Sequence, residues 1–206
     1  MTGQNTEKLI LIASSTGGPK ALHQLLPILN KNLDSPVVIV QHMPKGFTET
    51  LAKRLDEMCD IHVCEAKAEG FLEKGCVYIA RGGFHLQICQ TKEGGLYFHE
   101  TQDEPVKGLR PCADVTFESV SKCVVGQILC VVLTGMGADG CYGIRKIKEN
   151  GNVFTIAQDE KTCVVYGMPR AVVEKGLADV VLPLTEMGEF INKKVGVRYN
   201  GFKSIS

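Results

Sequence analysis

The chain has 206 residues, of which 44% are hydrophobic and 22% charged, a composition typical of one globular domain with a substantial core. Its 23 Lys and Arg residues balance 23 Asp and Glu residues, which excludes a surface that attracts nucleic acid or an anionic membrane by net charge. No apolar run approaches the ~20 residues of a membrane span, and the polar residues 1–7 predict no signal peptide, so we expect no membrane insertion and a cytoplasmic location.

Apolar runs and stretches with helical spacing alternate along the chain. Strands are predicted at residues 9–13, 37–41, 62–65, 76–80, 85–90, 96–100, 128–133, 153–157 and 180–182. The pair 85–90 and 96–100 reads as a β-hairpin. Helices are predicted at residues 20–29, 47–58, 112–122, 140–150 and 169–175, with a last helix near the carboxyl end.

Several residues predict how these helices begin and end. Pro27 should disturb the last turn of the first helix. Gly151 and Gly176 lie directly after predicted helices, where a left-handed glycine is common. Thr185 is a candidate N-cap for the last helix.

Buried Val, Ile and Leu strands alternating with helices predict a mostly parallel sheet covered on both faces. We therefore expect a three-layer α/β/α, doubly wound fold with a β-hairpin excursion, in one domain over residues 1–206 with its core at about 8–195. In such folds the functional site lies outside the carboxyl ends of the strands.

Three predicted strands end in residues that carry hydrolase chemistry. Ser15 follows the first strand in the turn 14–18, His42 follows the second, and Asp139 lies in the glycine-rich turn after the strand 128–133. A serine hydroxyl becomes a nucleophile when an imidazole takes its proton and a carboxylate orients that imidazole. The three residue types at one sheet edge favour a hydrolase.

Each of these residues also has a structural alternative. Ser15 could cap the first helix, His42 could be a satisfied histidine at a strand end, and Asp139 could cap the helix 140–150. The turn 14–19 could instead cradle a phosphate, although it fits neither G-x-G-x-x-G nor the Walker A pattern.

The nine cysteines are predicted to be reduced, because their number is odd, no C-x-x-C occurs and no secretion signal is seen. A metal site is the alternative, with ligands from cysteines together with His62, His85 or His99. The spacings match no standard ligand pattern, so buried structural thiols are expected. Cys141, two residues after Asp139, is the one expected in a cleft wall.

Several separated motifs resemble the catalytic domain of the chemotaxis receptor methylesterases, the CheB family. The turn 13–18 resembles the nucleophile turn of that family. Residues 41–48 resemble its Q-H-M-P-x-x-F-T motif, and residues 133–140 match its L-T-G-M-G-x-D-G motif in full. The resemblance extends from about residue 8 to 184 and includes the stretches 77–86 and 157–171.

The resemblance implies a role for each residue that matches these motifs. Ser15 rather than Ser14 matches the nucleophile, His42 the general base, and Asp139 the carboxylate that orients the histidine. The resemblance implies that backbone N–H groups in the turn after the strand 128–133, at Met136 with Gly135 and Gly137 beside it, stabilise the oxyanion. It implies that Thr16, next to the nucleophile, helps to align the histidine.

The implied activity is hydrolysis of glutamyl methyl esters on the cytoplasmic helical bundle of methyl-accepting chemotaxis receptors, through an acyl-enzyme and with release of methanol. Deamidation of receptor glutamines is implied as a second activity, and no metal or organic cofactor is needed. A methylesterase-like hydrolase with another protein substrate and a catalytically silent binding module are the alternatives. The family's regulatory receiver domain is expected to be absent from this chain.

The sequence departs from the family pattern at a few places. Ala13 stands where the nucleophile turn has glycine, and Arg81 stands where a proline is usual. Leu109 and Cys112 stand where histidine and serine are common. None of these departures is expected to touch the triad.

Overall fold

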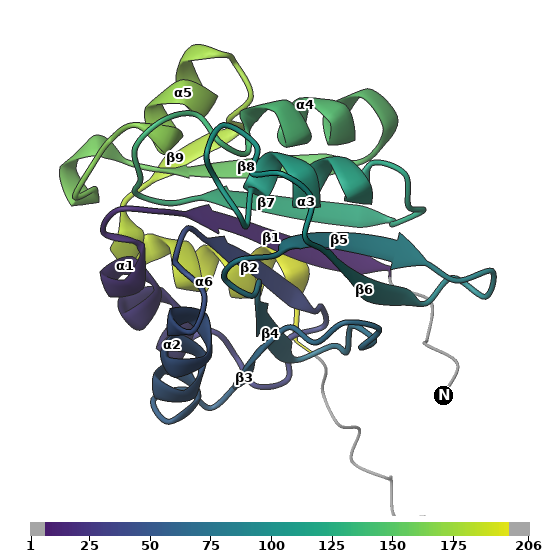
Figure 1. The fold of residues 1–206 in the computed structure, drawn as a ribbon. Coiled ribbons are helices and arrows are strands. Elements are labelled where there is room, and N and C mark those ends of the chain that lie inside the picture. The colour runs from purple at the N-terminus through teal and green to yellow at the C-terminus, as the bar shows by residue number, and fades with distance from the viewer. Residues whose placement is uncertain (1–6, 198–206) are drawn as a thin grey trace, which may run out of the picture.

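The computed structural model describes residues 7–197, so the polar segment predicted at the start lies almost entirely outside the described residues. Its centre is a seven-stranded sheet in the order β3-β4-β2-β1-β7-β8-β9, in which every pairing is parallel (Figure 1). The strands are β1 Lys8–Ser14, β2 Val37–Gln41, β3 His62–Glu65, β4 Cys76–Ile79, β7 Gln127–Val132, β8 Val153–Gln158 and β9 Val180–Leu182.

Helices cover both faces of this sheet (Figure 1). One face is covered by α1 Gly18–Leu25, α2 Phe47–Asp56 and α6 Leu184–Val195. The other is covered by α3 Ala113–Val120, α4 Cys141–Asn150 and α5 Met168–Glu174. Short 3-10 turns occur at η1 Leu26–Ile28 and η2 Glu160–Thr162. The predicted three-layer α/β/α architecture is confirmed.

The predicted hairpin is a separate two-stranded antiparallel sheet, formed by β5 His85–Gln90 and β6 Leu96–Thr101. Among the residues that the structure describes, the outer edge of β5 does not pair with a further strand. Its backbone groups hydrogen-bond to side chains of α3 instead. The Thr116 hydroxyl donates to the Leu86 carbonyl at 2.7 Å, and the Ile88 N–H donates to the Ser119 hydroxyl at 2.8 Å. These bonds fix α3 between the hairpin and the sheet.

The central strand β1 is buried on both faces because its side chains alternate between two apolar layers. Ile10 and Ile12 pack with α1, α2 and α6, whereas Leu9 and Leu11 pack with α3, α4 and α5. Burying such a side chain stabilises the fold by about 1.5–3 kcal/mol. The strand ends where Ser14 pairs with Gln41 of β2, which places Ser15 just beyond the end of the strand.

The predicted helix ends are partly wrong. The α-helical part of the first helix stops at Leu25 and a 3-10 turn follows, as Pro27 predicts, and Gly176 is left-handed at φ 65°. Gly151 is extended at φ −150°, because the chain turns directly into β8. Thr185 does not cap α6, since the helix already starts at Leu184 after Pro183.

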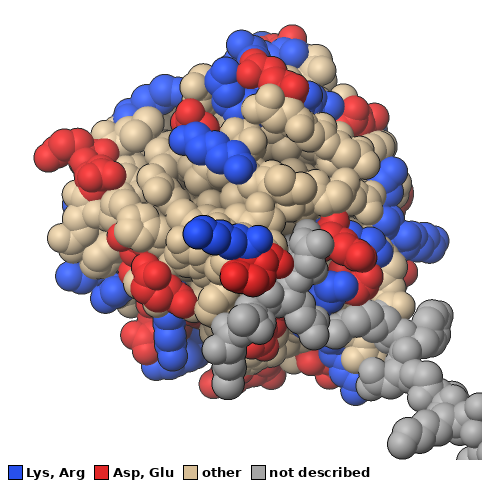
Figure 2. Space-filling model, turned by 90° about the vertical axis from the view of Figure 1, so that its right-hand side faces the viewer, with Lys and Arg blue, Asp and Glu red and all other residues tan. Residues whose placement is uncertain are grey.

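The surface agrees with the balanced composition. Lys and Arg side chains lie among Asp and Glu side chains on the face shown in Figure 2, without a large patch of one sign. Among the described residues no helix has the length and apolar character needed to cross a membrane.

Candidate active site at the carboxyl edge of the sheet

The two adjacent serines at the end of β1 have different surroundings. Ser14 is fully buried, and its hydroxyl donates to Gln41 Oε1 at 2.7 Å. Gln41 Nε2 in turn donates to the Ser15 carbonyl at 3.0 Å. Ser15 is partly exposed, and its hydroxyl makes no hydrogen bond within residues 7–197. Ser15 is therefore the serine whose hydroxyl remains available.

Ser15 does not cap the first helix, which was its structural alternative. The residue before α1 is Gly17, in a left-handed conformation at φ 82°, and no side chain caps the helix start. A side chain on Gly17 would also meet Val164 at 2.6 Å.

Backbone hydrogen bonds bring three strand ends together. In the β1–β2 register Ser14 lies opposite Gln41, and the His42 N–H donates to the Ser14 carbonyl at 3.0 Å. The Ser15 N–H donates to the carbonyl of Thr134, just after β7, at 3.0 Å. Ser15 thus lies between the ends of β2 and β7, where the sequence predicts it.

His42 and Asp139 are in direct contact. Their atoms Nε2 and Oδ2 are 2.7 Å apart, and the two side chains are only 9% and 4% exposed. Because Nε2 is engaged, Nδ1 is the ring nitrogen left for another partner. Within residues 7–197 no hydrogen bond joins His42 to Ser15, and such bonds are often long or poorly aligned before substrate binds.

Asp139 accepts four hydrogen bonds besides the one from the histidine. Its Oδ1 accepts from the Asp114 N–H at 2.9 Å, the Gly140 N–H at 3.0 Å and the Cys112 thiol at 3.1 Å, and its Oδ2 accepts from the Ala113 N–H at 2.6 Å. Burial by itself raises the pKa of this carboxyl, but the hydrogen bonds from the histidine, the thiol and the backbone outweigh burial and lower the pKa to about 2. Asp139 is therefore ionised at neutral pH.

Asp114, which the sequence analysis missed, performs the capping that was considered for Asp139. Its Oδ1 accepts from the N–H groups of Gly140, Tyr142 and Gly143 at 2.9–3.1 Å, at the start of α4. Asp139 in turn holds the first N–H groups of α3. Each carboxylate thus caps the other's helix. The only sequence signal was an acidic residue in the first turn of a helix, which is common.

These two carboxylates and the Cys112 thiol also form the kind of cluster that could hold a metal ion, since their ligand atoms lie within 4.8 Å of one another. However, the ligand oxygens already accept backbone N–H groups from two helix starts. A cation there would displace those donors and face the positive ends of two helices. Helix capping therefore accounts for the cluster.

The turn after β7 presents free N–H groups near Ser15. The Gly135 N–H donates to the Val165 carbonyl at 3.0 Å and is not available to a ligand. A Cβ on Gly135 would lie 2.8 Å from Ser15 Cβ, so this glycine permits close packing under the serine. The N–H groups of Met136 and Gly137 make no hydrogen bond within residues 7–197, and Met136 is 74% exposed.

Thr134 is a second residue that sequence reasoning missed. Its buried hydroxyl donates to the Thr16 carbonyl at 3.0 Å and accepts from the N–H groups of Val164 and Val165 at 3.1 and 2.9 Å. This hydroxyl ties the turn after β1 to the loop 159–167. The motif at residues 133–140 includes this threonine, but the motif does not indicate which groups its hydroxyl contacts. The Thr16 side chain is exposed and makes no hydrogen bond to His42 in the described part of the chain, so its predicted role stays a prediction.

One departure from the family pattern does touch the predicted site, contrary to expectation. Cys112 is 1% exposed and its thiol contacts Asp139. Cys141, expected in a cleft wall, is buried at the start of α4, and its thiol makes no hydrogen bond to His42 or Asp139. All nine cysteines are free, as predicted.

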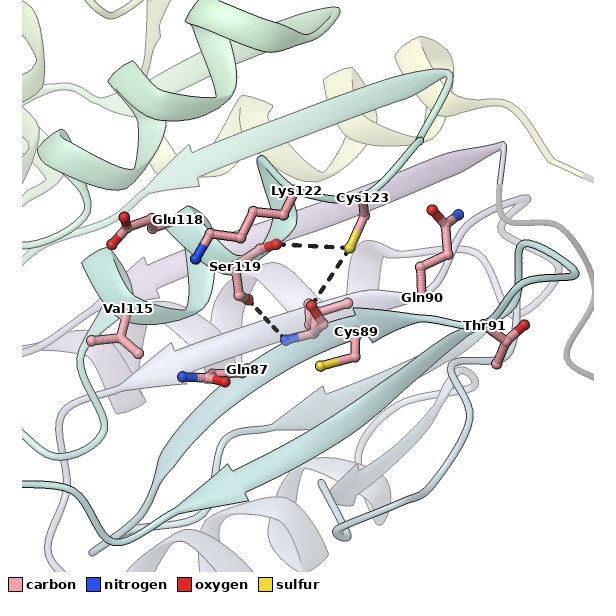
Figure 3. Close-up of a pocket in the computed structure, with 10 residues that line it drawn as sticks. Gln87, Cys89, Gln90, Thr91, Val115, Glu118, Ser119, Lys122 and Cys123 are labelled. Carbon is pink, nitrogen blue, oxygen red and sulfur yellow. Dashed lines mark hydrogen bonds between the residues drawn. The ribbon is translucent and has the colours of Figure 1, made fainter.

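A pocket of about 410 Å³ lies away from these residues, between β5 and the end of α3 (Figure 3). Its lining includes Cys89, Ser119, Lys122 and Cys123, and none of Ser15, His42 and Asp139. The Cys123 thiol is directed at the Ile88 and Ser119 carbonyls, at 3.5 and 3.7 Å. Of its polar groups, the Ser119 hydroxyl and the Cys123 thiol hydrogen-bond to the Ile88 backbone and so join α3 and the turn after it to the hairpin.

These features define a doubly wound α/β protein with a serine, a histidine and an aspartate at neighbouring strand ends, an arrangement resembling that of serine hydrolases. The family model described as CheB methylesterase matches residues 10–191, so the chain belongs to the CheB methylesterase family.

Individual relatives agree. A protein-glutamate methylesterase/protein-glutamine glutaminase of Syntrophomonas wolfei is 47% identical over 185 residues, which cover 88% of this chain and 52% of the relative. The Bacillus subtilis protein of the same name is 45% identical over 82% of this chain and 47% of its own length. The Thermotoga maritima CheB methylesterase catalytic domain superposes with a TM-score of 0.87 at 40% identity, covering 95% of this chain and all of that one.

The chain spans about half the length of the curated relatives it matches. It matches the whole of the solved catalytic domain. The expectations of a single domain over residues 1–206 and of no receiver domain in this chain stay predictions.

Proposed function

We propose that this chain hydrolyses glutamyl methyl esters on methyl-accepting chemotaxis receptors and also deamidates receptor glutamines. The relatives' names, protein-glutamate methylesterase/protein-glutamine glutaminase, support this reaction class. The observation that carries the proposal is the contact between His42 and an ionised Asp139 beside a serine with a free hydroxyl. The substrate would be the cytoplasmic helical bundle of the receptor, which places the proposed reaction in the cytoplasm.

The proposed reaction begins with Ser15. His42 takes the proton of the Ser15 hydroxyl while Ser15 Oγ forms a bond to the ester carbonyl carbon. Nδ1 is the nitrogen that accepts this proton, because Nε2 is held by Asp139 at 2.7 Å. The carboxylate stays ionised and stabilises the imidazolium that forms.

The tetrahedral intermediate carries a negative oxygen that needs donors. The N–H groups of Met136 and Gly137 are available for it, and the start of α1 adds the positive end of a helix. Collapse of the intermediate breaks the bond to the methoxy group, which takes the proton from His42 and leaves as methanol. His42 then takes a proton from water as the water oxygen attacks the acyl-enzyme carbonyl. The bond between the acyl carbon and Ser15 Oγ breaks, His42 returns the proton to Oγ, and the glutamate carboxylate leaves. With a glutamine side chain the same steps release ammonia.

The test is methanol release from membranes that contain methylated receptor. The chain should release methanol, and Ser15→Ala should lower turnover by roughly 10⁶-fold, as removal of the triad serine does in a comparable hydrolase. Ser14→Ala is the matched control, because its hydroxyl is bonded to Gln41 and it should keep most of the activity.

Near-normal activity of Ser15→Ala would refute the triad assignment. Hydrolysis by the unmodified chain of other methylated proteins, but not of receptors, would favour the alternative of a different protein substrate. No hydrolysis of any ester would favour a silent binding module.

A further inference from the structure

We propose that Cys112 is a positioning residue of the candidate triad: its thiol donates a hydrogen bond to Asp139 and thereby sets how strongly that carboxylate holds His42. The inference rests on the proposed function only for its catalytic readout. Its geometric basis is the Sγ–Oδ1 distance of 3.1 Å between two side chains that are both almost completely buried.

Cys112 is held in place by the residues that follow it. It is the N-cap residue of α3, in an extended conformation, and the next two N–H groups, of Ala113 and Asp114, donate to the same carboxylate. Three consecutive residues, Cys112, Ala113 and Asp114, therefore each donate a hydrogen bond to the Asp139 carboxylate. The backbone of Cys112, and with it the position of its Cβ, is thereby fixed relative to the carboxylate, and the thiol lies in a buried space beside Oδ1.

The direction of the hydrogen bond follows from the charges. Burial first, and then the neighbouring Asp139 carboxylate, raise the pKa of the Cys112 thiol to about 12, so the sulfur carries its proton at neutral pH. Asp139 is ionised and can only accept. The S–H group is therefore the donor and Oδ1 the acceptor.

A thiol is a weak donor, so it withdraws little charge from the Asp139 carboxylate and leaves that carboxylate a strong acceptor for the His42 N–H. A hydroxyl at this place would withdraw more charge from the carboxylate, whereas an aliphatic side chain would withdraw none. The carboxylate should hold the histidine N–H least tightly with a hydroxyl beside it, and most tightly with an aliphatic group. The other titratable groups next to this carboxylate are His42, Asp114 and the Cys141 thiol. Asp114 Oδ2 lies 3.5 Å from Lys107 Nζ, and neither Asp114 nor Lys107 hydrogen-bonds to the Cys112 thiol.

The test compares Cys112→Ser, Cys112→Ala and Cys112→Val. The alanine and valine variants both lack a donor but differ in side-chain volume. If packing causes the effect, the two variants should give different readouts; if loss of the donor causes it, they should give the same readout. The serine variant restores a donor. Cys141→Ala is the matched control, because Cys141 is also a buried cysteine of this region and its thiol makes no hydrogen bond to Ser15, His42 or Asp139.

The first readout is the proton NMR signal of the His42 N–H that is bonded to Asp139. A stronger carboxylate acceptor moves this signal downfield, so we expect the order serine, cysteine, then alanine and valine together. Equal signals in all four proteins, or alanine and valine on opposite sides of the unmodified chain, would overturn the proposal. This measurement requires no enzymatic activity.

The second readout is the pH profile of kcat/KM for methanol release. The alanine and valine variants should shift the acidic limb to higher pH and change kcat/KM at pH 7 by roughly two- to tenfold, the effect of one ordinary hydrogen bond, with Cys112→Ser reversing the shift. An unmodified chain without activity would refute the proposed function while the NMR order still decides the role of Cys112. An active chain whose NMR signal and acidic limb are insensitive to all three variants would refute the role of Cys112 alone.

Discussion

Replacing Asp139 by asparagine should destabilise the fold as well as impair catalysis. The side chain of asparagine has nearly the same shape but carries an NH₂ group in place of one carboxylate oxygen. In the native structure both oxygens of Asp139 accept backbone N–H groups, from Ala113 on one side and from Asp114 and Gly140 on the other. In either orientation the NH₂ group must therefore face a backbone donor.

The size of the effect follows from the pKa of this carboxyl. A fall from the ordinary value of 3.8 to about 2 means that folding favours the ionised form by about 2 kcal/mol. Because the folded-state pKa is depressed, this contribution is present in full above pH ~4 and is lost as the pH falls towards 2. The asparagine variant lacks the contribution at every pH.

Urea unfolding at several pH values measures this difference. At pH 7 we expect Asp139→Asn to be less stable than the unmodified chain by about 2 kcal/mol or more, and the gap to narrow below pH 4. Asp60→Asn removes the same charge from an exposed position and should have no comparable effect. Methanol release should also fall by about 10⁴-fold, as for the equivalent change in another triad hydrolase. An unchanged free energy of unfolding at pH 7 would show that this carboxylate does not hold α3.

Two further predictions concern stability. Thr134→Val should lower the free energy of unfolding by about 1–3 kcal/mol, because the N–H groups of Val164 and Val165 lose their acceptor. An unchanged urea midpoint would contradict this expectation. Gly176→Ala should lower the free energy of unfolding by about 1 kcal/mol, since Gly176 has φ 65°. Gly151 has φ −150°, so Gly151→Ala should be neutral or slightly stabilising. Equal shifts of the melting temperature in these two variants would contradict the backbone argument.

The sequence predicts the strand ends well because their causes are local. An apolar run that stops at Ser14 and another that stops at Gln41 are both buried strands of one parallel sheet, so their next residues must meet at one edge. The choice of Ser15 over Ser14 came from the resemblance, and the buried bond between Ser14 and Gln41 gives it a physical basis.

The contacts around Asp139 could not be predicted in this way. They join residues far apart in the chain, and they depend on how the loop 102–111 brings Cys112 to the start of α4. The reciprocal capping by Asp114 and Asp139 likewise depends on the packing of α3 against α4, where a Cβ on Gly143 would lie 2.4 Å from Phe117. Helix periodicity does not encode which carboxylate of a neighbouring element reaches a helix start.

Because of this capping, the position of the Asp139 carboxylate does not depend on whether His42 is protonated. In the proposed cycle the histidine gains and loses a proton twice, and a carboxylate held by the histidine alone could turn away each time. Asp139 keeps four other donors throughout, three of them backbone N–H groups that cannot rotate away. Its geometry is therefore set by the junction of α3 and α4. An orienting carboxylate needs this property, because it must direct the imidazole in both protonation states without following it.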